Sequence, residues 1–220
     1  IEFFTPFLKD GKDIIYIGFS SGLTGSLNSA RMAVEELKDT YKDRVITIID
    51  SLSASMGEGL LVADAISKRD SGATYSELVD YIETRKLQVN HWFTVNDLNH
   101  LHRGGRVSKT AAVVGSLLNI KPVLNVDNNG KLIPVEKQRG RKASLVSLVN
   151  KLQKYIVNPK EQIIFISHGN SFEDAKFVES ELLSKIKVKG TMINMIGPVI
   201  GAHSGPGTMA IFFFGKNRMV

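Results

Sequence analysis

The sequence predicts an α/β fold of two α/β domains, the first with a mainly parallel sheet flanked by helices and the second with a mixed sheet and helices. In the first half, apolar runs of strand length alternate with segments whose apolar residues recur at helical spacing, and such strand–helix units favour parallel pairing. In the second half, an Asn-Gly turn joins two strand-like runs, which indicates an antiparallel hairpin. We place the domain boundary at residue 88, so the expected domains are 1–88 and 89–220.

The first domain is expected to contain two strands and three helices. An Ile-rich run and a second apolar run have the length and composition of buried strands. Thr74 is followed three residues later by Glu77, and this pair forms a capping box that starts a helix. The predicted order is strand 13–20, helix 27–37, strand 45–50, helix 56–68 and helix 74–87.

The second domain is expected to combine strands, helices and the hairpin. Asp97 and Ser108 are predicted to cap two helices, because short polar side chains accept hydrogen bonds from free N–H groups of the first turn. The first of these helices is short and ends at Gly104. The remaining predicted helices are 109–118, 142–156 and 172–186, and the predicted strands are 91–95, 122–126, 131–135, 162–167, 190–195 and 208–214.

The composition is that of an ordinary soluble globular protein, with 43% hydrophobic and 23% charged residues among 220. No apolar run approaches the roughly 18 residues of a transmembrane helix. The sequence has no cysteine, which excludes disulfides and thiol nucleophiles and fits a reducing cytoplasm. The net charge is +6, and the densest basic cluster is 137–142. Because no nucleic-acid motif accompanies this cluster, we expect a solvated surface rather than nucleic-acid binding.

Three loops carry the residues that are best placed for chemistry. The Ser-rich loop 20–26 lies between a predicted strand and a helix N-terminus, where α/β proteins bind anions, although Thr24 or Ser26 can equally well be a helix cap. The loop 103–108 contains two arginines around a Gly-Gly pair that can simply end a helix. The loop 202–207 contains His203, which can contact an anion, act as acid or base, or be structural.

An enzymatic function leaves weaker traces in the sequence. A small-molecule enzyme, either a hydrolase or a phosphate-handling enzyme, could use the Ser-rich loop and His203, but the Gly-x-Ser-x-Gly elbow is missing. The Ser-rich loop matches neither a P-loop nor the GxGxxG motif. The histidines have no metal-ligand spacing, so we predict no metal site.

Six motifs in order resemble the DegV family, the fatty-acid-binding subunits of bacterial fatty acid kinase. Any one of these motifs is a weak signal, whereas six in the same order and spacing across nearly the whole chain are strong. The motifs are 19–26 (FSSGLTGS), 53–59 (SASMGEG), 101–107 (LHRGGRV), 115–123 (GSLLNIKPV), 135–142 (VEKQRGRK) and 203–207 (HSGPG).

The resemblance implies a cytoplasmic bacterial lipid-binding protein that performs no chemistry of its own. Such a protein buries a long-chain fatty acid as its ligand, needs no other cofactor, and presents the carboxylate to a separate ATP-binding kinase subunit. The kinase subunit makes an acyl phosphate for phospholipid synthesis. The resemblance implies that Ser20, Ser21, Arg106 and His203 bind the carboxylate, and that Arg139 serves the kinase partner or phosphoryl transfer. It implies neither nucleic-acid binding nor stable membrane insertion.

The chain departs from the family pattern at two places. The family begins with a longer N-terminal segment whose Thr-Ser-Gln-Pro motif also reaches the carboxyl group, and we expect that this segment is missing here. In addition, Met209 stands where the family usually has a small, Gly-containing stretch. We therefore expect Met209 to narrow or reshape the pocket.

Overall fold

The fold is given by a computed structural model that describes residues 1–108 and 119–218. The helix predicted over 109–118 therefore lies outside the described residues. The first elements are α1 (Thr5–Lys9), β1 (Ile14–Gly18), α2 (Ser26–Leu37), β2 (Ile46–Asp50), α3 (Met56–Asp70), α4 (Tyr75–Arg85) and the 3-10 turn η1 (Lys86–Gln88). They are followed by β3 (Val89–Thr94), α5 (Leu98–Arg103), β4 (Ile120–Val126), β5 (Leu132–Arg139), α7 (Arg141–Tyr155), the 3-10 turn η2 (Pro159–Glu161), β6 (Ile163–His168), α8 (Phe172–Lys185), β7 (Gly190–Met195), α9 (Pro198–Ser204) and β8 (Met209–Phe214).

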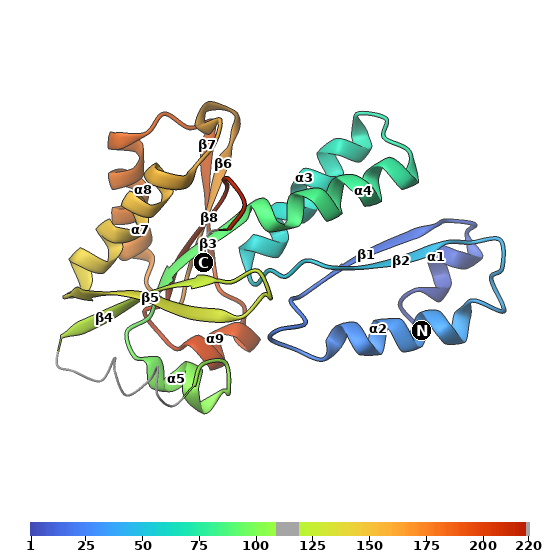
Figure 1. Ribbon diagram of the computed structural model, residues 1–220, viewed down its shortest axis with the longest axis horizontal. Coiled ribbons are helices and arrows are strands. Elements are labelled where there is room, and N and C mark those ends of the chain that lie inside the picture. Colours follow the sequence, from blue (N-terminus) through green and yellow to red (C-terminus); the bar gives the residue numbers. More distant parts are fainter. Residues whose placement is uncertain (109–118, 219–220) are drawn as a thin grey trace.

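A small parallel sheet forms the first part of the chain. Strands β1 and β2 pair in parallel with Ile14 opposite Ile46 and Gly18 opposite Asp50, which confirms the predicted pairing. The capping box before α4 is also confirmed, because the Thr74 side chain accepts a hydrogen bond from the Glu77 backbone N–H. The pair β1–β2 extends away from the rest of the molecule, with α1 and α2 beside it (Figure 1).

The second part of the chain forms a mixed six-stranded sheet, as the sequence predicted. The strand order is β5-β4-β3-β8-β6-β7, in which β6 and β7 are parallel and the other neighbours are antiparallel. The hairpin β4–β5 turns at Asp127, whose carboxylate accepts hydrogen bonds from the backbone N–H groups of Asn129 at 2.9 Å and Lys131 at 2.8 Å. Because these hydrogen bonds join residues within four positions of each other, the turn could be predicted from the sequence.

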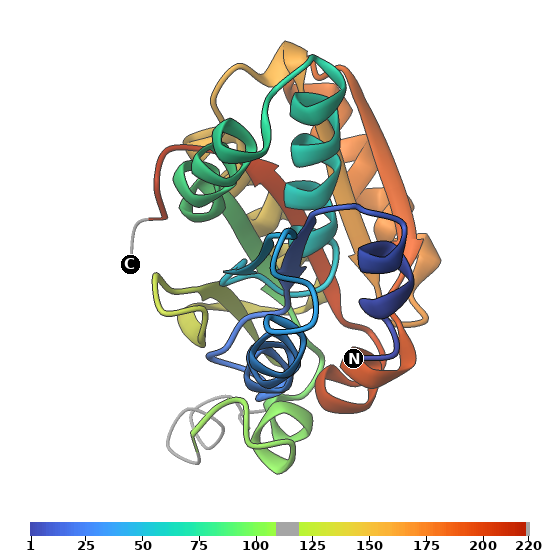
Figure 2. The same cartoon turned by 90° about the vertical axis from the view of Figure 1, so that its right-hand side faces the viewer.

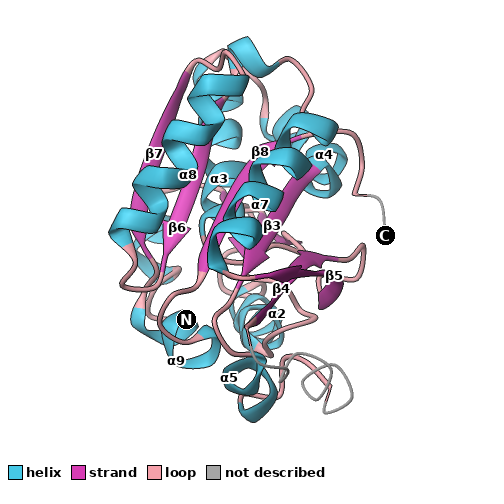
Figure 3. Cartoon of the chain, turned by 90° about the vertical axis from the view of Figure 1, so that its left-hand side faces the viewer, coloured by secondary structure: helices cyan, strands magenta, loops and turns pink. Residues whose placement is uncertain are grey.

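The two faces of the large sheet pack against different layers. Helices α7 and α8 cover one face, as Figure 3 shows, over a core that includes Val123, Ile211 and Phe213. Helix α3 packs on the other face, where Phe93 and Phe212 join the second large core cluster. Along each strand the side chains alternate between these two cores.

The alternation corrects the expectation for Met209. Its side chain is fully buried in the core beneath α7 and α8, whereas Thr208 and Ala210 on either side face α3. Met209 therefore fills the core on one side of the sheet and does not shape a pocket on the other.

Helix α3 connects the two sheets. It packs against β1 of the small sheet and against β3, β6 and β8 of the large one, and its Leu61 shares one core cluster with Ile49 of β2 and Phe93 of β3. The division into domains at residue 88 stays a prediction. It falls where η1 ends and β3 begins, the point at which the chain passes into the larger sheet.

The segment around His203 is more regular than the sequence suggested. We expected a loop over 202–207, but His203 lies in the last turn of α9. Pro198 starts this helix at a position where its missing N–H costs nothing, and Gly205, with φ of 80°, ends it. Figures 1 and 2 show α9 beside α5 at one end of the molecule.

Glu58 in the first turn of α3 should make stability depend on pH. Burial raises the pKa of its carboxyl group from 4.5 to about 7, and the described residues give it no hydrogen bond or ion pair. The folded state then binds more protons than the unfolded chain between these values, so stability falls as pH rises from about 4.5 to 7. Glu58→Gln should therefore raise the free energy of unfolding at pH 8 by about 1–2 kcal/mol, a range discounted for solvent screening and the helix dipole.

Thermal unfolding at pH 4 and pH 8 checks this expectation. The gain should be absent near pH 4, because both side chains are then neutral. The exposed Glu36 of α2 provides the control variant Glu36→Gln, which should change little at either pH. An equal gain from Glu58→Gln at both pH values would contradict the burial argument.

Candidate functional site

A cavity of about 390 Å³ lies among the small-sheet loops, the α3 face of the large sheet and α9. Its size is within the range of small-molecule sites in proteins. Most lining side chains are apolar, namely Phe19, Leu23, Ala54, Phe93, Leu101, Val126, Leu132, Ile196, Val199, Ile200, Ala210 and Phe212. The polar minority consists of Thr24, Ser26, Ser55, His91, Arg106, Ser167, His203, Ser204 and Thr208. This combination suits a mainly apolar ligand with one polar end.

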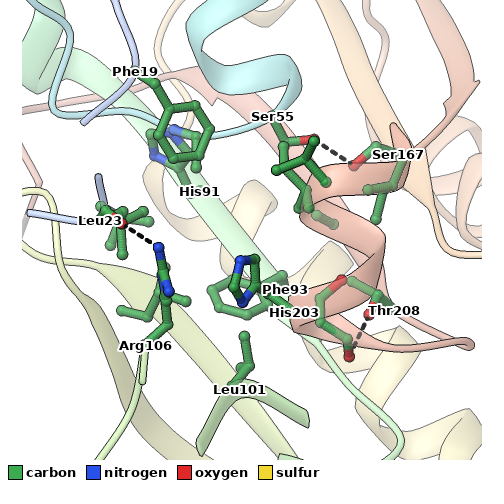
Figure 4. Close-up of a pocket in the computed structure, with 18 of the residues that line it drawn as sticks. Phe19, Leu23, Ser55, His91, Phe93, Leu101, Arg106, Ser167, His203 and Thr208 are labelled. Atoms are coloured by element: carbon green, nitrogen blue, oxygen red, sulfur yellow. Dashed lines mark hydrogen bonds between the residues drawn. The ribbon is translucent and has the colours of Figure 1, made fainter. Parts of the chain in front are cut away.

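Among the described residues that line the cavity, Arg106 is the one arginine or lysine. Its guanidinium donates to the Leu23 carbonyl at 2.9 Å and to the Gly104 carbonyl, and Figure 4 shows the side chain directed into the cavity. Within the described residues no carboxylate pairs with it. A half-buried guanidinium that meets only carbonyl oxygens retains donors and an uncompensated charge for an anionic group.

His203 points into the same cavity from α9 (Figure 4). Its ring lies against Gly104, where any Cβ would collide with the ring nitrogen Nδ1. The Gly-Gly pair therefore ends α5 and also makes room for the histidine. Over the described residues, no hydrogen bond joins His203 to a serine hydroxyl or a carboxylate.

The structure does not bring Ser20 and Ser21 to the cavity wall. The Ser20 side chain is fully buried, and its hydroxyl donates to the Gly130 carbonyl at 2.8 Å. Ser21 is exposed, and its backbone N–H donates to the Asp50 carboxylate at 3.2 Å. Ser20 thus ties the loop after β1 to the β4–β5 turn, and the lining residues of this loop are Phe19, Leu23, Thr24 and Ser26.

Sequence reasoning missed two polar features of the cavity. The hydroxyls of Ser55 and Ser167, which both line the cavity, lie within hydrogen-bond distance of each other at 3.4 Å, although they are 112 positions apart in sequence. His91, which the sequence placed at the start of a strand, is buried within β3, and its Nε2 accepts a hydrogen bond from the Ala54 N–H at 3.4 Å. Burial, with a smaller effect of the nearby Arg218 charge, lowers the pKa of His91 well below 6.5. The ring is therefore neutral at neutral pH.

Arg139 lies away from the cavity. A β-bulge interrupts the pairing of β4 with β5, because Pro134 and Glu136 face adjacent residues of β4. Lys137 and Arg139 therefore project on the same sheet face as Leu132, which lines the cavity, while Glu136 projects toward α7. Arg139 is exposed and lies roughly 20 Å along the strand from Leu132 at 3.3 Å per residue.

The described residues contain neither a transmembrane helix nor a metal cluster. No helix among them is long and apolar enough to cross a membrane. Nor do they bring three or more His, Cys, Asp or Glu side chains together in a group that could hold a metal ion.

Comparison with known proteins places this fold and cavity in a family. The family model described as "Uncharacterised protein, DegV family" matches residues 1–216. The chain belongs to the DegV family. A DegV domain-containing protein of Clostridium perfringens is 45% identical over 218 residues, which cover 99% of this chain and 75% of that protein. The family resemblance expected from the sequence is thereby confirmed.

Solved DegV structures share the fold. The fatty acid binding DegV family protein of Streptococcus agalactiae superimposes with a TM-score of 0.84 and 27% identity, covering 98% of this chain and 75% of that one. The Streptococcus pneumoniae Fatty Acid Kinase (Fak) B3 protein, solved with linoleic acid, gives a TM-score of 0.84 over 96% of this chain and 76% of that one. At 24% identity, this second likeness carries the fold alone.

Proposed function

We propose that this DegV-family chain binds a long-chain fatty acid in the cavity and presents its carboxylate to a separate ATP-binding kinase subunit for phosphorylation to an acyl phosphate. The observation that carries the binding part is a mainly apolar cavity lined by Arg106, which has no carboxylate partner in the part of the chain that the structure describes. The fatty-acid binding of the Streptococcus agalactiae relative supports the same ligand class.

The physical chemistry of the cavity suits such a ligand. Each buried methylene contributes about 0.8 kcal/mol, so a long acyl chain supplies ample affinity. A carboxylate is costly to bury without donors, and we propose that Arg106 and His203 supply them. Ser20 and Ser21 were expected to do the same. Ser20 instead supports the site indirectly, because its hydroxyl holds the loop after β1 against the β4–β5 turn. A direct contact between Ser21 and the carboxylate requires that loop to move.

The partner and the location of the protein also belong to the proposal. The kinase subunit is inferred from the family motifs and from the exposed position of Arg139. Phosphoryl transfer then needs no ATP or metal site on this chain. A cytoplasmic location follows from the same inference, since the kinase subunit depends on ATP.

Mass spectrometry of the purified protein tests ligand binding directly. Organic extraction of natively purified protein should release long-chain fatty acid in nearly equimolar amount. A sample that contains no fatty acid, and that also fails to take up added palmitate or oleate, would contradict the proposal. Partial occupancy is resolved by adding oleate and repeating the extraction.

Gly104 offers a second test, because it determines where His203 can lie. Its backbone is helical with φ of −73°, so Gly104→Ala should fold normally while its new Cβ displaces the His203 ring. Fatty-acid affinity should fall by roughly three- to tenfold, as expected from the loss of one hydrogen bond. Gly25→Ala is the matched control, since no atom lies within 4 Å of its Cβ position. Unchanged affinity in both variants would remove His203 from the carboxylate site.

A further inference from the structure

Arg218, near the end of the described chain, is buried with 3% of its surface exposed. Its guanidinium makes five hydrogen bonds, and no carboxylate accepts any of them. Nε donates to the Val89 carbonyl at 2.8 Å, Nη1 to the carbonyls of Leu52 at 2.7 Å and Asp127 at 3.1 Å, and Nη2 to the Ser53 hydroxyl at 3.0 Å and the Lys86 carbonyl at 3.1 Å.

The buried guanidinium remains a cation. Burial lowers the pKa of Arg218 to about 10, partly offset by Asp127 and Asp50, so the group is still protonated at neutral pH. Burying a charge without a counter-ion in direct contact is costly. Five aligned acceptors offset that cost only while the segments that carry them stay together.

These acceptors belong to separate walls of the cavity. Leu52 and Ser53 are in the loop after β2, Asp127 is in the β4–β5 turn, and Val89 starts β3. Arg218 itself does not line the cavity, but each of these segments contributes residues that do. The lining residues next to them are Ala54 and Ser55 in the loop, Val126 before the turn, and His91 and Phe93 in β3.

The loop after β2 needs such a hold because its backbone is strained. Leu52 has φ of 48° and Ser55 has φ of 55° with ψ of −137°, conformations that side-chain-bearing residues rarely adopt. They persist only where the surroundings fix them. Arg218 fixes the Leu52 carbonyl and the Ser53 side chain, while the Ser55 hydroxyl lies within hydrogen-bond distance, 3.4 Å, of the Ser167 hydroxyl.

We propose that Arg218 is a positioning residue that holds the loop 51–55, the turn 127–130 and β3 together around the cavity, and thereby sets how fast a bound ligand leaves. This inference rests on the proposed fatty-acid binding. An enclosed acyl chain leaves when the walls part, and parting the loop from the turn breaks the bonds of one guanidinium. Weakening the hydrogen bonds of that guanidinium should increase the release rate of the ligand while the overall fold is retained.

The variant Arg218→Lys tests the proposal on the full chain. Lysine keeps the charge but has three donors in place of the planar fork of five. With an anthroyloxy-labelled stearate displaced by excess oleate in stopped flow, release should be about tenfold faster, as expected from losing part of a charge-assisted network. Amide hydrogen exchange should rise in 51–55 and 127–130 but remain unchanged in β6 and α8.

Arg141→Lys is the matched control. Arg141 is a part-buried arginine that pairs with Asp174 at 2.7 Å on the α7–α8 side of the large sheet. If both variants accelerate release equally, or if Arg218→Lys releases the probe at the wild-type rate, the proposal is overturned.

If Arg218→Lys does not fold, Ser53→Ala provides a second test. This variant removes one acceptor and should give roughly threefold faster release, and an unchanged release rate then overturns the proposal. Failure of the wild-type chain to take up the probe instead overturns the proposed function, and the exchange pattern still reports on Arg218.

Discussion

Replacing Arg106 by leucine should remove most of the affinity for fatty acid. The guanidinium is the cation of the cavity and has no carboxylate partner among the described residues. A hydrogen bond to a charged group contributes about 1.5–3 kcal/mol, so the dissociation constant should rise by about 10- to 150-fold. Titration calorimetry with palmitate measures this change. Leucine preserves apolar contact with the cavity wall, so the loss reports on the carboxylate end of the ligand.

Arg103→Leu provides the control for this measurement. Arg103 is exposed and lies three positions earlier in the chain, and its hydrogen-bond partner among the described residues is the His100 ring at 3.2 Å. Its replacement removes the same charge from the same region without touching the cavity. A similar loss of affinity in both variants would show that long-range charge, rather than contact with Arg106, attracts the ligand. Full affinity in Arg106→Leu would place the carboxylate elsewhere.

The parts of the fold that were predictable from sequence depend on neighbouring residues. The capping box at Thr74 and the hairpin turn at Asp127 are both completed by side chains within four positions. Strand–helix alternation gives the parallel pairing of β1 with β2, because a helix between two strands returns the chain to the end of the sheet at which the first strand began. Such signals survive in a single sequence.

The cavity was less predictable, because distant segments build it. The Ser55–Ser167 contact and the hold of Arg218 on Leu52 join residues more than 100 positions apart, and no spacing rule reports them. Met209 was misplaced for a related reason. The size of its side chain suggested an obstruction of the pocket, but the side chain faces the core beneath α7 and α8. The alternation of side chains along a strand is known from sequence, whereas the face to which each set points is not. The family motifs pointed to Arg106 and His203, which line the cavity, and also to Ser20 and Ser21, which do not.

Arg139→Ala should separate partner recognition from ligand binding. Between residues 128 and 160 the chain has eight Lys or Arg against one Glu, so this segment carries more net positive charge than the whole protein. Arg139 is exposed within it, on the sheet face of the cavity but roughly 20 Å away from Leu132. Charges in such a position orient and attract a partner rather than hold a buried ligand.

The Arg139→Ala protein should therefore still co-purify with fatty acid, while acyl-phosphate formation with the kinase subunit and ATP falls by roughly tenfold or more. The effect should shrink at high salt, where surface charges are screened. Arg31→Ala, which removes an exposed arginine from α2, should leave both measurements unchanged. If Arg139→Ala instead loses its fatty acid while its circular dichroism spectrum is that of the wild type, Arg139 contributes to the ligand site and the division of roles is wrong.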